Sequence, residues 1–350
     1  MELAGWGRLY DQSVMPKSES SSSLAELWQP RLLVLGERIR EALRVSMAEQ
    51  DLERTSAVRR DEEGDTIFGI DVDAEAILLE LAEVWGREAP FTLVAEGLEP
   101  ASGLVFGTGQ PRSRLIVDPI DGTRGLMFDK RSAWCLAAVA PERGGETRLS
   151  DVVVAHMAEL PTTRQGRVDE LWARAGEATR GRRIDLASAS ASVFVPRPSR
   201  ATTLRHGFAT VCSFFQGGKE LTARIDEDLI GAAIGGWDHR KAEVYVDQYI
   251  SSGGQLAELA LGRDRFVLDI RPLVHAALGY EGTLCSKPYD LCTTLVARQA
   301  GCVILTPDGA PLDSPLDTTT NLAFAGYANE ALATRLAPLV RATLERHGAL

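Results

Sequence analysis

Three stretches of the chain carry apolar residues at the three- and four-residue steps of one helix face. Their apolar positions are Leu32, Leu35, Ile39, Leu43 and Met47; then Ile77, Leu78, Leu81, Val84 and Trp85; and last Leu332, Leu336, Leu339, Val340 and Leu344. The pattern predicts an amphipathic helix near each end of the chain and a third after residue 70. Residues 1–22 end in a serine-rich cluster and are predicted to form a mobile leader.

Shorter apolar runs at 91–95, 115–117 and 303–305 have the length of buried strands. Helices and strands that mix along one chain predict an α/β or layered α+β protein. The segment 194–200 carries two prolines and is the best candidate linker. We therefore expect an N-terminal α+β subdomain over 23–195 and a C-terminal α/β subdomain over 196–350, with a cleft between them.

Composition limits the class of protein and its partners. A chain of 350 residues with 45% hydrophobic residues can bury a large core, and its net charge of −11 argues against nucleic acid as a nonspecific partner. Its 5 cysteines are scattered, which fits reduced thiols in a cytoplasmic protein. Neither an apolar run of membrane-spanning length nor a basic, signal-like start occurs, so we expect no membrane association.

The segment 118–123, Asp-Pro-Ile-Asp-Gly-Thr, directly follows the apolar run 115–117 and carries the densest chemistry of the chain. Pro119 stiffens the turn that brings Asp121 back beside Asp118, and two such carboxylates repel unless a cation lies between them. Gly122 leaves room for a ligand, and the backbone N–H groups of the turn could hold a phosphate, with the Thr123 hydroxyl alongside. The segment predicts a site for hard cations and phosphate.

This segment, followed by the apolar stretch 134–140, is similar to the signature of the inositol monophosphatase family of metal-dependent, lithium-sensitive phosphatases. The superfamily also contains fructose-1,6-bisphosphatases and 3′-phosphoadenosine-5′-phosphate phosphatases. Three further segments occur in the order that the family requires, so the resemblance covers roughly residues 30–340. It implies an αβαβα layered fold and hydrolysis of a phosphomonoester.

Two of these segments lie before residue 118. The segment 65–75 resembles the family element in which an Asp accepts a proton from the threonine of the Asp-Gly-Thr turn, and the resemblance makes Asp71 and Thr123 the catalytic pair. The segment 91–99 resembles the strand that ends in a metal-binding glutamate. Glu96 matches that position, but the pattern is degraded around it, so Glu99 competes for the role.

The third segment, Ser-Lys-Pro-Tyr-Asp at 286–290, resembles the family's Lys-Pro-Trp-Asp and makes Asp290 the last metal carboxylate. A Trp-Asp pair at Asp238 lacks the helix and strand that should follow, so Asp290 is preferred. Between them, the glycine-rich segment 251–263 resembles a helix whose first amides face the substrate. Gly253, Gly254 and Gln255 are its candidate phosphate-binding residues.

The resemblance assembles a metal site from four carboxylates and one main-chain carbonyl. These ligands are Glu96, Asp118, the carbonyl of Ile120, Asp121 and Asp290. So many negative charges in one cleft require cations, and oxygen-only ligands suit Mg²⁺ better than zinc. We expect two or three Mg²⁺ ions that activate a water for attack on the phosphate.

The substrate is left open by the sequence. The resemblance implies an inositol monophosphatase type of enzyme acting on a small phosphorylated metabolite, yet Thr283 stands where that type carries a sugar-contacting Glu. Arg124, Lys130 and Arg131 could meet a second phosphate, as in a 3′(2′),5′-bisphosphate nucleotidase, or could form a solvated basic loop; fructose-1,6-bisphosphatase is a further alternative. A catalytically silent protein that binds a metal or phosphometabolite is the alternative of another class. The resemblance also implies a homodimer.

Overall fold

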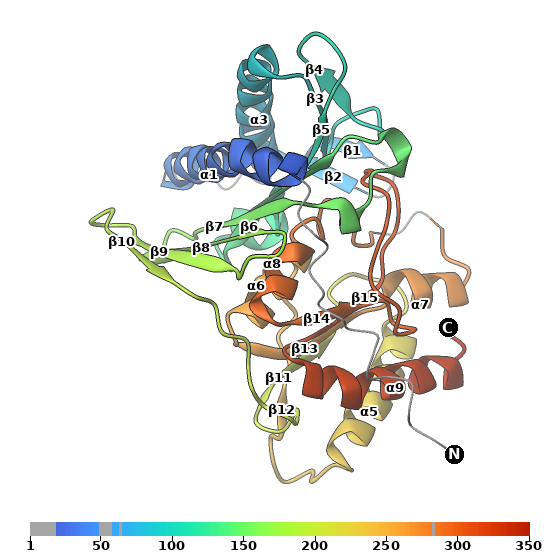
Figure 1. Cartoon of the computed structure of the whole chain (residues 1–350). Coiled ribbons are helices and arrows are strands. Elements are labelled where there is room, and N and C mark those ends of the chain that lie inside the picture. The colour runs from blue at the N-terminus through green and yellow to red at the C-terminus, as the bar shows by residue number, and fades with distance from the viewer. Residues whose placement is uncertain (1–18, 49–57, 63–64, 282–283) are drawn as a thin grey trace.

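We describe the protein from a computed structural model that defines residues 19–48, 58–62, 65–281 and 284–350 (Figure 1). Its helices are α1 (Glu19–Ala48), α3 (Gly69–Glu88), α4 (Thr123–Met127), α5 (Lys219–Ile234), α6 (Ser252–Ala260), α7 (Arg271–Ala277), α8 (Thr294–Ala300) and α9 (Glu330–Arg346). None of these described helices is both long and apolar enough to cross a membrane.

Most strands belong to two sheets. The large sheet has the order β10-β9-β8-β7-β6-β5-β3-β4, in which only β3 and β5 pair in parallel. Its strands are β3 (Phe91–Ala95), β4 (Leu104–Phe106), β5 (Ser113–Asp121), β6 (Ala133–Pro141), β7 (Val154–Leu160), β8 (Arg167–Arg174), β9 (Arg180–Asp185) and β10 (Ala191–Phe194).

The small sheet has the order β12-β11-β13-β15-β14 and is mixed, because β11 pairs in parallel with β12 and β13 while β15 runs antiparallel to its neighbours. Its strands are β11 (Gly207–Val211), β12 (Val244–Tyr245), β13 (Asp264–Asp269), β14 (Val303–Leu305) and β15 (Phe324–Tyr327). A separate hairpin pairs β1 (Val58–Glu62) with β2 (Asp65–Phe68).

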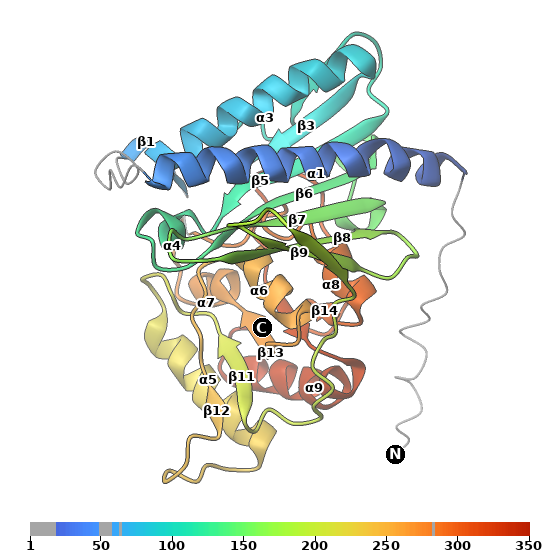
Figure 2. The ribbon, with the colours of Figure 1, turned by 90° about the vertical axis from the view of Figure 1, so that its left-hand side faces the viewer.

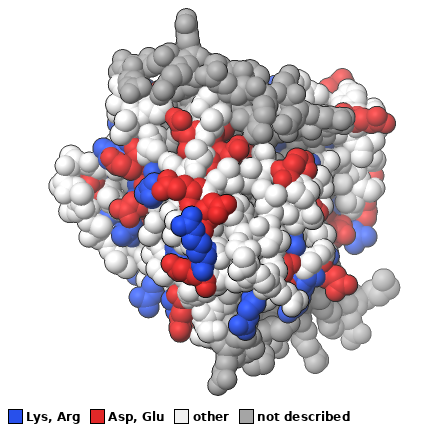
Figure 3. Space-filling model, turned by 90° about the horizontal axis from the view of Figure 1, so that it is seen from above, with Lys and Arg blue, Asp and Glu red and all other residues white. Residues whose placement is uncertain are grey.

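The helices and sheets stack in five layers (Figures 1 and 2). Helices α1 and α3 cover the outer face of the large sheet, α6 and α8 lie between the two sheets, and α5 and α9 cover the outer face of the small sheet. The predicted αβαβα arrangement is confirmed. On the face drawn in Figure 3, acidic and basic side chains of the described residues are interspersed.

The position of strand β5 in the large sheet explains why its sequence contains an unbroken apolar run. Leu115 and Val117 pack into the core under α1 and α3, whereas Ile116 points to the opposite face and packs into the core between the sheets. Both faces of β5 are therefore dry, as expected for a central strand covered by helices on both sides. The two carboxylates that follow at its end consequently lie in a buried environment.

The predicted helices form, with two differences at their edges. Helix α1 begins at Glu19, inside the stretch assigned to the leader, and its buried face includes Ala25 and Trp28 ahead of the predicted Leu32. The rest of the predicted leader, residues 1–18, lies outside the described residues. In α3, Val84 is 45% exposed, so the buried face is narrower than the apolar pattern indicated.

The chain passes from the large sheet to the small sheet between Phe194, the end of β10, and Gly207, the start of β11. The predicted linker 194–200 lies in this passage. Whether the parts before and after it are separate subdomains stays a prediction.

Candidate active site

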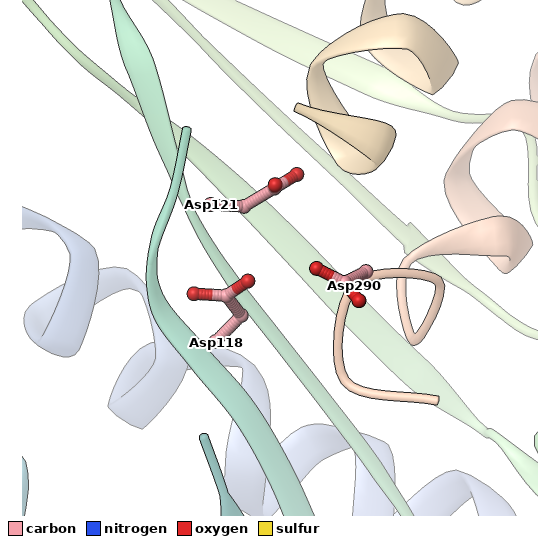
Figure 4. A group of neighbouring side chains, drawn as sticks. All are labelled: Asp118, Asp121 and Asp290. Carbon is pink, nitrogen blue, oxygen red and sulfur yellow. The ribbon is translucent and has the colours of Figure 1, made fainter. Parts of the chain in front are cut away.

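Three carboxylates converge at the junction of the two sheets. Each of Asp118, Asp121 and Asp290 offers an oxygen within 4.8 Å of the others. Figure 4 shows Asp118 and Asp121 on one strand and Asp290 facing them from a separate loop. The strand is β5, and the loop precedes α8. Sequence positions about 170 residues apart therefore meet in an arrangement that suits an oxygen-binding cation.

A β-bulge places the first two carboxylates on the same side of the sheet. Side chains alternate along a regular strand, so residues three apart point to opposite faces. Asp118 pairs with Leu136 and Asp121 with Trp134, so three steps on β5 match two steps on β6. The extra residue on β5 brings the side chains of Asp118 and Asp121 back to the same face of the sheet. Pro119 lies within the bulge, where its missing N–H is tolerated.

Burial makes ionisation of Asp118 and Asp121 unfavourable. Asp118 is 1% exposed, and its burial raises the pKa of its carboxyl well above the usual value, with a further rise from Asp121 and Asp290. Burial also raises the pKa of Asp121 to about 6, although hydrogen bonds from Ser251 and the Gly253 amide oppose the rise. Buried, mutually repelling carboxylates of this kind fit a bound divalent cation, which would supply the missing positive charge.

Glu96 and Glu99 are placed differently. Glu96 lines the cavity that contains the three aspartates, and a hydrogen bond with it partly offsets the raised pKa of Asp118. Glu99 is exposed and is not part of the cavity lining. Of the two candidates, only Glu96 is positioned to share a cation with the aspartates.

The predicted catalytic pair is in contact. Thr123 Oγ1 lies 2.9 Å from Asp71 Oδ1 and 2.8 Å from the Ile120 carbonyl oxygen, so its single hydrogen can be donated to either. Asp71 belongs to the first turn of α3, and Thr123 begins α4. Ile120 and Thr123 both line the cavity beside Asp118 and Asp121.

Gly122 turns the chain from the bulge into α4. Its φ of 104° lies in the left-handed region that glycine favours. A Cβ atom there would lie 3.1 Å from Ser251 Cβ and 3.2 Å from the Ile250 carbonyl oxygen. Glycine at this position therefore lets the segment before α6 pack closely against the turn. Gly122 also lines the cavity, where a phosphate contact was predicted.

The first residues of α6 form hydrogen bonds within the protein. The Gly253 amide donates to Asp121 Oδ2 at 2.6 Å, and the Gly254 amide donates to the capping hydroxyl of Ser251 at 2.8 Å. The Gln255 side chain contacts Cys212 and donates to the Tyr249 carbonyl. None of Gly253, Gly254 and Gln255 belongs to the cavity lining. The Gly253 amide thus helps to hold the Asp121 carboxylate, and a phosphate contact by Gly253, Gly254 or Gln255 stays a prediction.

The remaining sequence-based candidates differ in whether they line the cavity. Asp238, the rejected alternative to Asp290, forms ion pairs with Arg240 and Lys241 in a turn away from the cavity. Arg124 lines the cavity, but Lys130 and Arg131 line a different groove. Lys130 and Arg131 therefore do not share a cavity with Arg124. Thr283 lies outside the described residues.

Several cavity residues have no counterpart among the sequence-based candidates, among them Phe214, Phe215 and Arg271. Arg271 is buried and forms a paired hydrogen-bonded contact with Asp269, with Nη2 2.6 Å from Asp269 Oδ2. Its guanidinium also lies 4.5 Å from the centroid of the Phe214 ring. In the sequence these positions show only two adjacent phenylalanines, a pattern that does not indicate a ligand site by itself.

Comparisons with known proteins identify the fold class. No family model matches the sequence, and no curated protein sequence matches it. Solved structures with the same architecture include inositol monophosphatases and a fructose-1,6-bisphosphatase, so the protein shares their fold.

Three structures illustrate the match. A hypothetical protein from Pyrococcus horikoshii with similarities to inositol-1 monophosphatase gives a TM-score of 0.60 at 14% identity, covering 90% of this chain and 98% of its own. The extragenic suppressor protein SuhB from Bartonella henselae gives 0.59 at 16% identity, covering 89% and 98%. Fructose-1,6-bisphosphatase from Leishmania major gives 0.60 at 15% identity, covering 94% and 96%.

Proposed function

We propose that the protein is a Mg²⁺-dependent phosphomonoesterase that hydrolyses a small phosphorylated metabolite. The observation that carries the proposal is that the cluster of three aspartates lies beside the Thr123–Asp71 pair. Three carboxylates, two of them buried, offer oxygens within 4.8 Å of one another, and Thr123, which contacts Asp71, lines the same cavity. A cation site beside a hydroxyl–carboxylate pair is the arrangement needed to position and deprotonate a water.

The proposed metal ligands come from both halves of the chain. Asp118, Asp121 and Asp290 would hold two or three Mg²⁺ ions together with Glu96 and the Ile120 carbonyl. Bound Mg²⁺ would activate a water and stabilise charge on the phosphate.

Thr123 orients that water. Since its hydroxyl hydrogen can be donated to Asp71 at 2.9 Å, an oxygen lone pair is available to accept a hydrogen bond from the water. Asp71 would take up the proton that Thr123 passes on. Gly122 keeps this turn free of a side chain that would obstruct the phosphate.

The substrate proposal starts from the inositol monophosphatase type. Fructose 1,6-bisphosphate and a 3′(2′),5′-bisphosphate nucleotide are the alternatives, and Arg124 in the cavity wall favours a substrate with a second anionic group. A silent binding protein is the alternative of another class. The homodimer and the cytoplasmic location stay predictions, the first testable by gel filtration with light scattering.

The test is phosphate release with Mg²⁺ from myo-inositol 1-phosphate, fructose 1,6-bisphosphate and 3′-phosphoadenosine 5′-phosphate. We expect Asp121→Asn to lower kcat by at least about 10²-fold, because it removes a charge that holds the cation. Asp238→Asn is the matched control, since Asp238 lies outside the cavity. Equal rates in wild type and Asp121→Asn would refute the assignment, and metal binding without turnover of any substrate would support the silent binding protein.

A further inference from the structure

A second hollow of the surface lies beside the C-terminal end of α6, and we call it the basic groove. It has a volume of about 650 Å³, which is typical of small-molecule sites. Among the described residues it shares no lining residue with the cavity of the three aspartates. Its lining contains three acids and twice as many cations, which are Lys130, Arg131, Arg164, Arg167, Arg183 and Arg263. The groove is therefore positive in a chain whose net charge is −11.

The three acids form the floor of the basic groove, and the cations form its rim. Arg183 bonds both oxygens of Asp169, and the Arg183 side chain is 46% exposed whereas that of Asp169 is 4% exposed. Arg263 lies 3.0 Å from Glu258, with exposures of 45% and 12%. The third acid, Glu159, is buried and accepts a hydrogen bond from the Asp169 amide at 2.9 Å. A ligand that enters from solvent thus meets guanidinium groups before carboxylates.

The floor also fixes the direction of the rim. Asp169 of β8 lies directly opposite Arg183 of β9, and it accepts a further hydrogen bond from Arg263 at 3.2 Å. The guanidinium of Arg183 packs 5.2 Å from the centroid of the Phe194 ring. Its bonds to Asp169 engage Nε and Nη2, so the N–H groups of Nη1 can still be donated to a ligand. A guanidinium held in this way loses less conformational freedom when it binds.

Lys130 and Arg167 complete the rim from the solvent side. Both side chains are exposed. The carboxylate partner of Arg167 is Asp185, which lies 3.9 Å away and is itself partly exposed. An exposed ion pair of this kind contributes little to stability, so a ligand with several negative charges can replace Asp185 at small cost.

We propose that the basic groove is a second anion-binding site, which takes a small molecule carrying at least two phosphate or carboxylate groups. Guanidinium groups bind the oxygens of both kinds of group in pairs. Cations spread along a groove of this size favour a ligand with several charges over one small anion. The site lies apart from the aspartate cavity and does not depend on the proposed phosphatase activity.

The test measures binding of pyrophosphate and of citrate to the whole chain by isothermal titration calorimetry in excess EDTA. Without divalent cations the clustered aspartates repel anions, so the cavity does not compete for the probes. We expect saturable binding of at least one probe, and tighter binding of pyrophosphate or of citrate would indicate a phosphorylated or a polycarboxylate ligand. The double variant Lys130→Gln/Arg167→Gln should raise the Kd by about tenfold or more, because two charged donors are lost. Both substituted side chains are exposed, so the fold should be kept.

Two further variants locate the probe. Arg224→Gln is the matched control, because Arg224 is an exposed arginine paired with one carboxylate, Glu220, and lies outside the groove. Arg124→Gln changes the aspartate cavity instead. Both variants should bind the probe as wild type does. Absence of saturable binding, a Kd unchanged in the double variant, an equal rise in Arg224→Gln, or a loss confined to Arg124→Gln would each overturn the inference.

Discussion

Thr123 is the residue at which sequence and geometry agree most closely. The motif made it a candidate beside the metal carboxylates, and the structure places its hydroxyl between Asp71 and the Ile120 carbonyl. The partner could be named because the family resemblance pairs these two positions. The choice between Glu96 and Glu99 required the structure, since only the path of the turn after β3 separates a cavity residue from an exposed one.

Replacing the threonine tests whether this hydroxyl orients the water. Thr123→Val keeps the branched shape but removes the hydroxyl, and we expect it to lower kcat by about 10²-fold or more. Thr123→Ser keeps the hydroxyl and should retain most of the activity. Steady-state kinetics on whichever phosphoester is turned over would decide, and a Thr123→Val enzyme as active as Thr123→Ser would exclude the proposed role.

At the scale of single elements, the sequence predicted the strand but not its irregularity. The apolar run before Asp118 indicates a central strand, and Pro119 indicates a turn or an interruption. The bulge depends on which residues of β6 lie opposite, and no local pattern reports that register. The same limit applies to α6, whose glycines suggested an anion site. The Gly253 amide donates to Asp121, and glycine is needed there because a Cβ atom would lie 2.3 Å from Leu136 and prevent this close packing.

Gly122→Ala tests the turn that follows the bulge. The substitution forces a side chain into a left-handed backbone and adds a Cβ 3.1 Å from Ser251 Cβ, so we expect a loss of about 1–3 kcal/mol in the free energy of unfolding. Gly309→Ala is the matched control, because its φ is also positive at 92° but the added Cβ meets nothing within 4 Å. Urea unfolding would measure both. Equal losses in the two variants would show that the approach to Ser251 costs nothing.

At the scale of the whole molecule, the site exists only because the two sheets pack around α6. Asp118 and Asp121 come from the large sheet, whereas Asp290 follows the small-sheet strand β13 and precedes α8. The order of motifs along the chain let the three clustered aspartates be predicted. Phe214 and Arg271 could not be predicted, because they reach the cavity only through the path of the chain after β11 and β13, which carries no motif.

A cation that joins the two halves should stabilise the molecule. We expect Mg²⁺ at about ten times its Kd to raise the free energy of unfolding by about 1.4 kcal/mol, seen as a Tm increase of a few degrees. Asp290→Asn should abolish the increase, because it removes the ligand from the second half, while Asp238→Asn should keep it. Differential scanning fluorimetry with and without chelator provides the measurement.

The pH dependence of this stabilisation follows from the raised pKa of Asp121, about 6 in the metal-free fold against 3.8 for an ordinary aspartate. Between these values the folded chain binds a proton that the unfolded chain has released, so metal-free stability is lost as the pH rises toward and through 6. Mg²⁺ competes with that proton for the carboxylate. The Tm increase caused by Mg²⁺ should therefore be larger at about pH 8 than at about pH 5. An increase that is the same at both values would mean that the cation does not bind at Asp121.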